Sequence, residues 1–204
     1  MQNLMSIIKT IMLFALTFYS GTLYGQQESL PINISIFNES TSIPYTRFLT
    51  TPIHPGIQIG TEFEGKTKNH WRFYPSISIG YMFHRKLFQG IYLNADLGID
   101  YQTNFGINIK SKLGIGYLHT FATQQEFQFN GSKYESNSDR GNARLMPSFT
   151  LGLGYNLHKK DPHSPEIYLL YQSWIEYPYS PGFIPLMTHT NLHLGAKFYP
   201  FKSK

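Results

Sequence analysis

Two histidines near the carboxyl terminus have a spacing that could hold a metal ion. His189, Asn191 and His193 occupy alternate positions, so in a β-strand both imidazoles point to the same face. A zinc site needs further ligands from a neighbouring strand, and the preceding segment offers Glu176. Because two histidines without a clear carboxylate partner make a weak ligand set, we expect hydrogen bonding by these rings and predict no metal centre and no cofactor.

Acidic and basic side chains lie on the polar face of several consecutive segments. A short turn at 66–70 would bring Glu64 close to Arg72, and strand pairing on the other side would bring Asp100 toward the same guanidinium. In a confined interior such ion pairs are strong only when their hydrogen bonds are satisfied, and a lone charge is costly. The pattern therefore predicts a polar network near one end of the structure.

A second turn, at 102–105, would place Asp96 opposite Lys110 or Lys112. These groups extend the network along the interior, and polar filling is a simpler interpretation of them than an ion or proton path. The predicted network consists of Glu64, Arg72, Asp96, Asp100, Lys110, Lys112, His189 and His193.

A nucleophile and a base are also present, on the apolar face. Ser173 and His119 could serve acyl transfer if they met and an acid oriented the base. A whole strand, Phe149 to Leu157, is expected between them, which separates them by roughly 10 Å at about 4.8 Å per strand. We therefore predict no catalytic residues, and a lipid acyl hydrolase remains an alternative.

The elements that must position these groups are strands of strict alternation. In the stretch GIYLNADLGIDY, Gly90 to Tyr101, every odd position is apolar, whereas the even positions include two carboxylates, an amide and a glycine. Period-2 alternation over many segments predicts an all-β, antiparallel protein. The predicted strands, about eight in number, cover residues 32–38, 56–65, 71–83, 90–101, 106–121, 147–157, 166–177 and 186–201.

The polar face of these strands is too poor in charge for a water-exposed surface. Charged residues make up 14% of the chain, against roughly 25% in soluble domains, and glycine, serine and asparagine dominate that face. Aromatic residues gather near the ends of the apolar face, as in the girdles of transmembrane barrels. The pattern favours an up-and-down transmembrane β-barrel with the apolar face toward lipid; a secreted sandwich with an aromatic core is the alternative.

Connection lengths support the barrel independently. With the N-terminus placed in the periplasm, the two long connections, 39–55 and 122–145, both fall at the outer end, as such barrels prefer. An eight-stranded barrel is just wide enough for side chains to fill its interior. We therefore expect a filled lumen, with a small channel as an alternative, and an extracellular ligand at the 122–145 connection.

The N-terminus indicates export. Lys9 precedes a short apolar stretch that is followed by small residues near Gly25, the organisation of a secretory signal peptide. We predict a signal peptide at 1–25 and one barrel domain at 26–204. The formal charge of +5 is scattered and the chain has no cysteine, so nucleic acid is not an expected partner and disulfides are excluded.

From residue 26 onward the chain resembles the small outer-membrane β-barrel proteins of Gram-negative bacteria. The resemblance rests on the alternating strands and on the last one, LHLGAKFYPF, with aromatic residues near its end. It implies localisation in the outer membrane after signal cleavage, contact with outer-membrane lipid, and recognition of the final strand by the barrel-assembly machinery. It implies no activity, so surface recognition or a structural role is the expected function.

Overall fold

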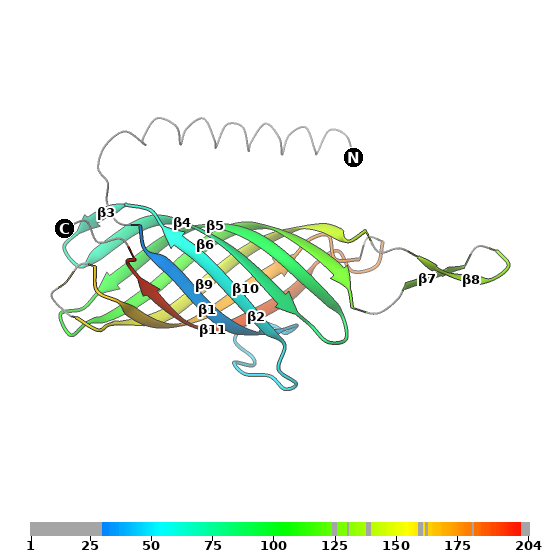
Figure 1. Ribbon diagram of the computed structural model, residues 1–204, viewed down its shortest axis with the longest axis horizontal. Helices are drawn as coiled ribbons and strands as arrows, with labels where there is room; N and C mark the ends of the chain where they lie inside the picture. Colours follow the sequence, from blue (N-terminus) through cyan, green and yellow to red (C-terminus); the bar gives the residue numbers. More distant parts are fainter. Residues whose placement is uncertain are drawn as a thin grey trace, which may run out of the picture. The chain divides into compact units, whose positions relative to one another are not determined.

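A closed antiparallel β-barrel of eight strands forms the body of the protein (Figure 1). The computed structural model describes residues 30–123, 126–129, 131–137, 140–158, 161, 163–180 and 182–200. The predicted signal peptide, 1–25, lies outside the described residues. The barrel strands are β1 (Ile32–Ser40), β2 (Pro55–Glu62), β4 (Trp71–Phe83), β5 (Phe88–Gln102), β6 (Ile107–Ala122), β9 (Asn142–Asn156), β10 (Glu166–Glu176) and β11 (Met187–Phe198).

Every barrel strand pairs with its neighbours along the chain, and β1 pairs with β11 to close the cylinder. The predicted up-and-down topology and strand number are thereby confirmed. Strand β3 (Lys66–Lys68) extends the edge of β4, whereas β7 (Glu126–Phe129) and β8 (Tyr134–Asn137) pair only with each other. No helix in the described part of the chain is long and apolar enough to cross a membrane.

The apolar face of each strand points outward. On β5, Leu93 and Leu97 are 45% and 68% exposed, whereas the alternating Tyr92 and Asn94 are each 1% exposed. Exposed aromatic side chains lie toward both ends of the outer face, with Trp71 among them. Because an outer surface this rich in exposed isoleucine and leucine is unfavourable in water and matches the lipid-facing band of membrane barrels, the predicted orientation of the two faces is confirmed.

Two ends of the barrel can be distinguished. At the terminal end, where β1 begins and β11 ends, the connections are short; at the loop end lie the connections 41–54, 84–87, 123–141 and 177–186. The predicted long connection 122–145 is shorter at its carboxyl side, because β9 already begins at Asn142 and pairs with Thr120 of β6. The segment EFQF within it forms β7.

Inward side chains change in character along the barrel. On β4 they run from Arg72 and Tyr74 at the terminal end, through two serines and a glycine, to Met82 and then His84 just past the strand. The middle-to-loop-end section contains an apolar layer that consists of Phe37, Met82, Phe88, Tyr92, Leu118, Met146 and Trp174.

Glycines on the inward face make room for rings from the adjacent strand. A Cβ added at Gly98 would lie 2.5 Å from the ring of Tyr74, and one at Gly80 would lie 2.2 Å from that of Tyr92. These contacts explain why the polar face alternates so often with glycine.

Candidate functional site

The terminal end of the lumen is filled by a cluster of opposite charges, here called the charged plug. The cluster contains three carboxylates and four cations. In each of its ion pairs the cationic nitrogen lies within 4.0 Å of a carboxylate oxygen. Its members are Glu62, Arg72, Asp100, Lys110, Lys112, Glu166 and Lys197.

Each carboxylate of the plug contacts at least two cations. Asp100 lies 2.8 Å from Lys110 and 3.6 Å from Arg72. Glu166 lies 2.9 Å from Lys110 and 2.7 Å from Lys197. Both carboxylates are fully buried, so these contacts offset a large desolvation cost that would otherwise exclude charge from the interior.

Glu62, rather than Glu64, provides the third carboxylate. Its carboxylate lies 2.6 Å from Arg72 and 3.4 Å from Lys197. Strand β2 ends at Glu62, which pairs with Ser76 of β4, so Glu64 falls beyond the strand and is exposed. The prediction that Glu64 belongs to the network was therefore wrong. Glu62, two positions earlier on the same face, takes its place.

The register between β5 and β6 also differs from the prediction. Their pairing extends to Gln102 and Asn108, so Asp100 is opposite Lys110 and Asp96 is opposite Gly114. The turn covers residues 103–106, where Gly106 has a φ of 90°. Asp96 consequently accepts a hydrogen bond from Asn94 at 2.6 Å instead of facing Lys110.

Asp96 and Lys112 nevertheless share a small polar cavity in the lumen. Its lining also includes Glu62, Ser76 and Tyr168. Lys112 approaches Glu62 at 3.9 Å, so the cavity borders the charged plug.

His189 and His193 both point into the lumen, as predicted, but they belong to different groups. His193 lies 3.1 Å from the Ser35 hydroxyl and 3.4 Å from the Gln172 side-chain oxygen. His189 instead lies between two glutamates: Nδ1 is 2.9 Å from Glu39 and Nε2 is 3.0 Å from Glu176. The predicted proximity of Glu176 to His189 is confirmed.

A second interior cluster, here called the rim cluster, lies at the loop end. It consists of Glu39, His54, His84, Arg144, Glu176 and His189. Arg144 Nε lies 3.2 Å from Glu176, and its guanidinium also donates to the carbonyl oxygens of Pro178 and Tyr179. The ring of His189 stacks on Trp174, with centroids 4.1 Å apart.

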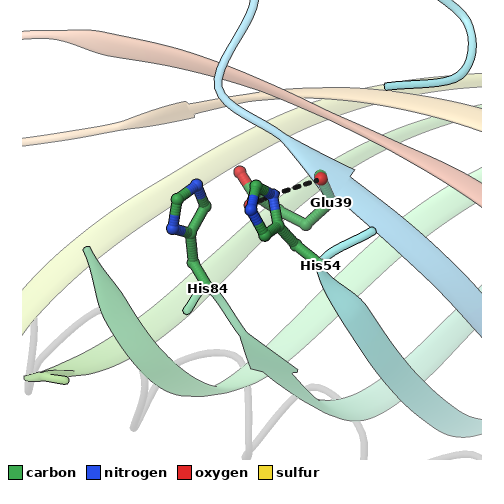
Figure 2. A group of neighbouring side chains, drawn as sticks. All are labelled: Glu39, His54 and His84. Carbon is green, nitrogen blue, oxygen red and sulfur yellow. Dashed lines mark hydrogen bonds and ion pairs between the residues drawn. The ribbon is translucent and has the colours of Figure 1, made fainter. Parts of the chain in front are cut away.

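Three members of the rim cluster form one cross-strand row, on β1 and at the adjoining ends of β2 and β4. Asn38 pairs with Pro55, and Gly56 pairs with Met82, so continuing these registers places Glu39 beside His54 and His54 opposite His84. Directly opposite residues in a sheet have Cβ atoms about 5 Å apart. The three side chains accordingly point toward one another, with His54 between the other two (Figure 2).

The two imidazoles of this row are in contact, because the rings of His54 and His84 stack with centroids 3.6 Å apart. One nitrogen of each ring and one carboxylate oxygen of Glu39 lie within 4.8 Å of one another. Burial lowers the pKa of His84 below its ordinary value, against the opposing effect of the Glu39 carboxylate, and the adjacent His54 lowers it further.

The sequence interpretation missed this row. His54 lies in the connection between β1 and β2, where a side chain is commonly solvated, yet it is buried. The overlooked signal is that both histidines directly flank strands that pair with each other, in phase with the inward residues Gly56 and Met82. The direct pairing of β2 with β4 brings the two histidines together.

Ser173 and His119 do not meet. Ser173 pairs with Phe149 of β9, which pairs with Leu113 of β6, so Ser173 is level with a residue six positions from His119. His119 instead lies 3.0 Å from the Tyr117 hydroxyl and 3.3 Å from the Arg140 carbonyl. The register gives the serine no general base.

Comparisons with known proteins support the architecture. No protein-family profile matches the chain, and no curated protein sequence matches it. The structure of Neisserial surface protein A is similar at a TM-score of 0.53 and 9% identity, covering 84% of this chain and 97% of that protein. The fold is that of a small Gram-negative outer-membrane β-barrel.

Two further outer-membrane β-barrels align over a similar length. Ail, the attachment invasion locus protein of Yersinia pestis, shows 15% identity and a TM-score of 0.45, covering 83% of this chain and 95% of its own. The outer-membrane enzyme PagL shows 8% identity and a TM-score of 0.47, and the alignment covers 82% of this chain and 98% of PagL. Identities this low concern the fold of an outer-membrane barrel and leave the function of this chain open.

Proposed function

We propose that the protein is a closed outer-membrane β-barrel whose working surface is the loop end. The observation that carries the closed barrel is that side chains fill its inward face at two levels. The charged plug occupies the terminal end, and the apolar layer that includes Tyr92 and Met82 lies farther along the lumen. An ion crossing the barrel would have to displace both.

Orientation and export follow the general rules for such barrels. We infer that the terminal end faces the periplasm, because short turns are typical of that side and long loops of the outside. A signal peptide at 1–25 would be removed near Gly25, and the barrel-assembly machinery would insert the mature chain at the final strand. Outer-membrane lipid would then surround the exposed belt of apolar residues.

The loop end is the natural place for surface recognition. Strands β6 and β9, of 16 and 15 residues, support a connection that contains the separate β7–β8 sheet. Recognition residues commonly lie on loops carried by a rigid scaffold. We infer an extracellular ligand or surface as the partner of this connection.

Two measurements test the closed barrel. Membrane fractionation with gel migration before and after boiling should show a heat-modifiable outer-membrane protein, and recovery as a soluble periplasmic protein would contradict the proposal. In planar lipid bilayers the purified protein should show little steady conductance. Large, reproducible single-channel steps would instead establish the small channel.

A lipid acyl hydrolase is the alternative that can be tested without assuming a substrate. Mass spectrometry should find the same lipids in cells with the wild type, with Ser173→Ala and with no protein, because Ser173 has no base within reach. Loss of an acyl chain that depends on Ser173 would overturn the proposed recognition role in favour of an enzyme.

A further inference from the structure

We propose that Glu39, His54 and His84 form a binding site for a divalent transition-metal ion of the zinc class. The three side chains are 0%, 9% and 8% exposed, and their ligand-type atoms lie within 4.8 Å of one another. They approach from three places in the chain, namely β1 and the residues that flank β2 and β4 (Figure 2).

One carboxylate oxygen of this group is left without a hydrogen bond. Glu39 Oε1 lies 2.9 Å from His189 Nδ1, whereas the buried Oε2 makes no hydrogen bond with any residue that the structure describes. Leaving a buried charged acceptor unsatisfied is costly. Its nearest basic group is the ring of His54, with Nδ1 at 3.7 Å, so the free oxygen faces the two imidazoles.

Neighbouring groups hydrogen-bond to two of the proposed ligands and orient them, as is usual around metal sites. His54 Nδ1 lies 3.2 Å from the main-chain oxygen of Glu39, which leaves Nε2 as the nitrogen able to bind a metal. Ligating histidines commonly donate their other N–H to a carbonyl in this way, and ligating carboxylates are themselves hydrogen-bonded. His189 performs the latter role for Glu39, and Glu176 fixes the orientation of His189.

His84 must adjust most when a metal binds. Its Nδ1 accepts hydrogen bonds from the amides of Lys86 and Leu87 at 3.3 and 3.2 Å, so the neutral ring carries its proton on Nε2. Coordination through Nε2 requires the other tautomer, in which Nδ1 carries the proton and can no longer accept from these amides. Both hydrogen bonds must therefore break and the 84–87 connection must rearrange, at the net cost of two hydrogen bonds.

The site must also contract slightly. Bonds of about 2.0–2.1 Å in a tetrahedral zinc site place ligand atoms roughly 3.3 Å apart, whereas the ligand atoms of the three residues lie within 4.8 Å of one another. The main chains of His54 and His84 are held by hydrogen bonds from Glu39 N to the His54 carbonyl at 2.9 Å and from His84 N to the Phe88 carbonyl at 2.8 Å. The contraction must therefore come from rotation of the side chains, which turns the two stacked rings so that their nitrogens converge on the metal.

The donor set selects the class of metal. Two imidazoles and one carboxylate suit zinc and related transition ions, whereas calcium and magnesium prefer sites built from oxygen. Three protein ligands leave one tetrahedral position open for water or for a ligand. A bound ion would join the connections 41–54 and 84–87 to the wall of the barrel.

The test uses the full chain extracted in detergent, treated with chelator and shown to be folded by its heat-modifiable migration. Zinc is titrated by calorimetry, and cobalt is titrated by visible absorption, whose intensity distinguishes tetrahedral from octahedral coordination. We expect one equivalent to bind. His54→Gln, His84→Gln and Glu39→Gln should each weaken the affinity at least about tenfold.

Matched histidines elsewhere serve as controls. His70 and His158 are exposed, and His70→Gln and His158→Gln should leave the affinity unchanged. Trypsin provides a second readout: zinc should slow cleavage after the exposed Arg85 and Lys86 in the wild type and not in His84→Gln. Failure of the folded wild type to bind one equivalent, or binding that survives all three ligand substitutions, would overturn the proposal.

Discussion

The two ends of the lumen use the same inward face in different ways. In the charged plug, Asp100 and Glu166 each contact two cations within 4.0 Å. In the rim cluster, Glu39 has one oxygen in contact with His189 and the other without a hydrogen bond among the described residues. Glu166 Oε2 in the plug also makes no hydrogen bond among the described residues, but Lys197 Nζ lies 2.7 Å from it. The basic atom beside Glu39 Oε2 is His54 Nδ1, at 3.7 Å, so the rim carboxylate is the less compensated of the two.

This difference separates structure from function on physical grounds. Satisfied ion pairs between buried charges close the barrel and specify its register, but they leave no charged atom available to bind a ligand. An unsatisfied carboxylate oxygen beside two imidazoles costs stability unless something binds it. The comparison therefore supports a structural role for the terminal end and the proposed binding role for the loop end.

Removing the central cation of the plug should have the largest effect. Lys110 lies 2.8 Å from Asp100 and 2.9 Å from Glu166, so Lys110→Met leaves two buried carboxylates short of a partner. We expect a loss of about 3–5 kcal/mol in the free energy of unfolding, measured by urea titration in lipid vesicles with the gel-migration shift.

Lys68 provides the matched control for Lys110, because it is exposed on β3. Lys68→Met should change the free energy by less than about 0.5 kcal/mol. An equally small effect of Lys110→Met would show that the plug does not hold the barrel together, and the comparison between the ends would fail.

The response to zinc sharpens the other side of the comparison. At a free concentration 100 times its Kd, zinc should stabilise the wild type by about 2.7 kcal/mol. Because their affinity is expected to be at least tenfold weaker, His84→Gln and Glu39→Gln should each gain at most about 1.4 kcal/mol at the same zinc concentration. Thermal unfolding with and without zinc measures this difference, and an equal gain in His84→Gln would place the metal elsewhere.

The sequence was sufficient for the fold but not for the site. Strict alternation, as in the stretch from Gly90 to Tyr101, determines which side chains face inward, so the barrel and its filled lumen were predictable. Cross-strand partners depend on where each turn begins. Because β5 and β6 pair as far as Gln102 and Asn108, Asp96 lies opposite Gly114, and its predicted opposition to Lys110 or Lys112 was wrong.

The rim cluster was missed for a related reason. His54 and Glu39 are neighbours only through the pairing of β1 with β2, across the connection 41–54. The composition of that connection does not predict which residues of β1 and β2 lie opposite each other. A sequence pattern finds the inward face of a strand, whereas the partners across that face require the actual pairing.

A methyl group added beside the plug should have a moderate effect. A Cβ at Gly98 would lie 2.5 Å from the Tyr74 ring, which is held by a hydrogen bond of 2.8 Å to Asp100 and by Arg72 at 4.1 Å from the ring centroid. Because the ring cannot move without breaking these contacts, Gly98→Ala should cost about 1–3 kcal/mol in the same urea titration.

Gly90 is the matched position on the same strand and face. The atom nearest to its added Cβ is the terminal Cδ1 of Leu118, at 2.9 Å, and a flexible side chain can move aside. Gly90→Ala should therefore cost less than Gly98→Ala. The reverse order would mean that the plug is the more adaptable of the two regions.

Removal of the β7–β8 sheet should have the smallest effect on stability. Its strands pair only with each other, and β6 and β9 remain paired up to Thr120 and Asn142 without it. Replacing residues 124–139 with a short Gly-Ser turn should change the free energy of unfolding by less than about 0.5 kcal/mol, because loop-closure costs vary slowly with length.

The barrel should keep its gel-migration shift and its zinc affinity, whereas any surface-binding phenotype of whole cells should disappear. A barrel that fails to assemble would show that this connection is structural, and binding that survives the replacement would move the recognition surface to the other loops beside the rim cluster.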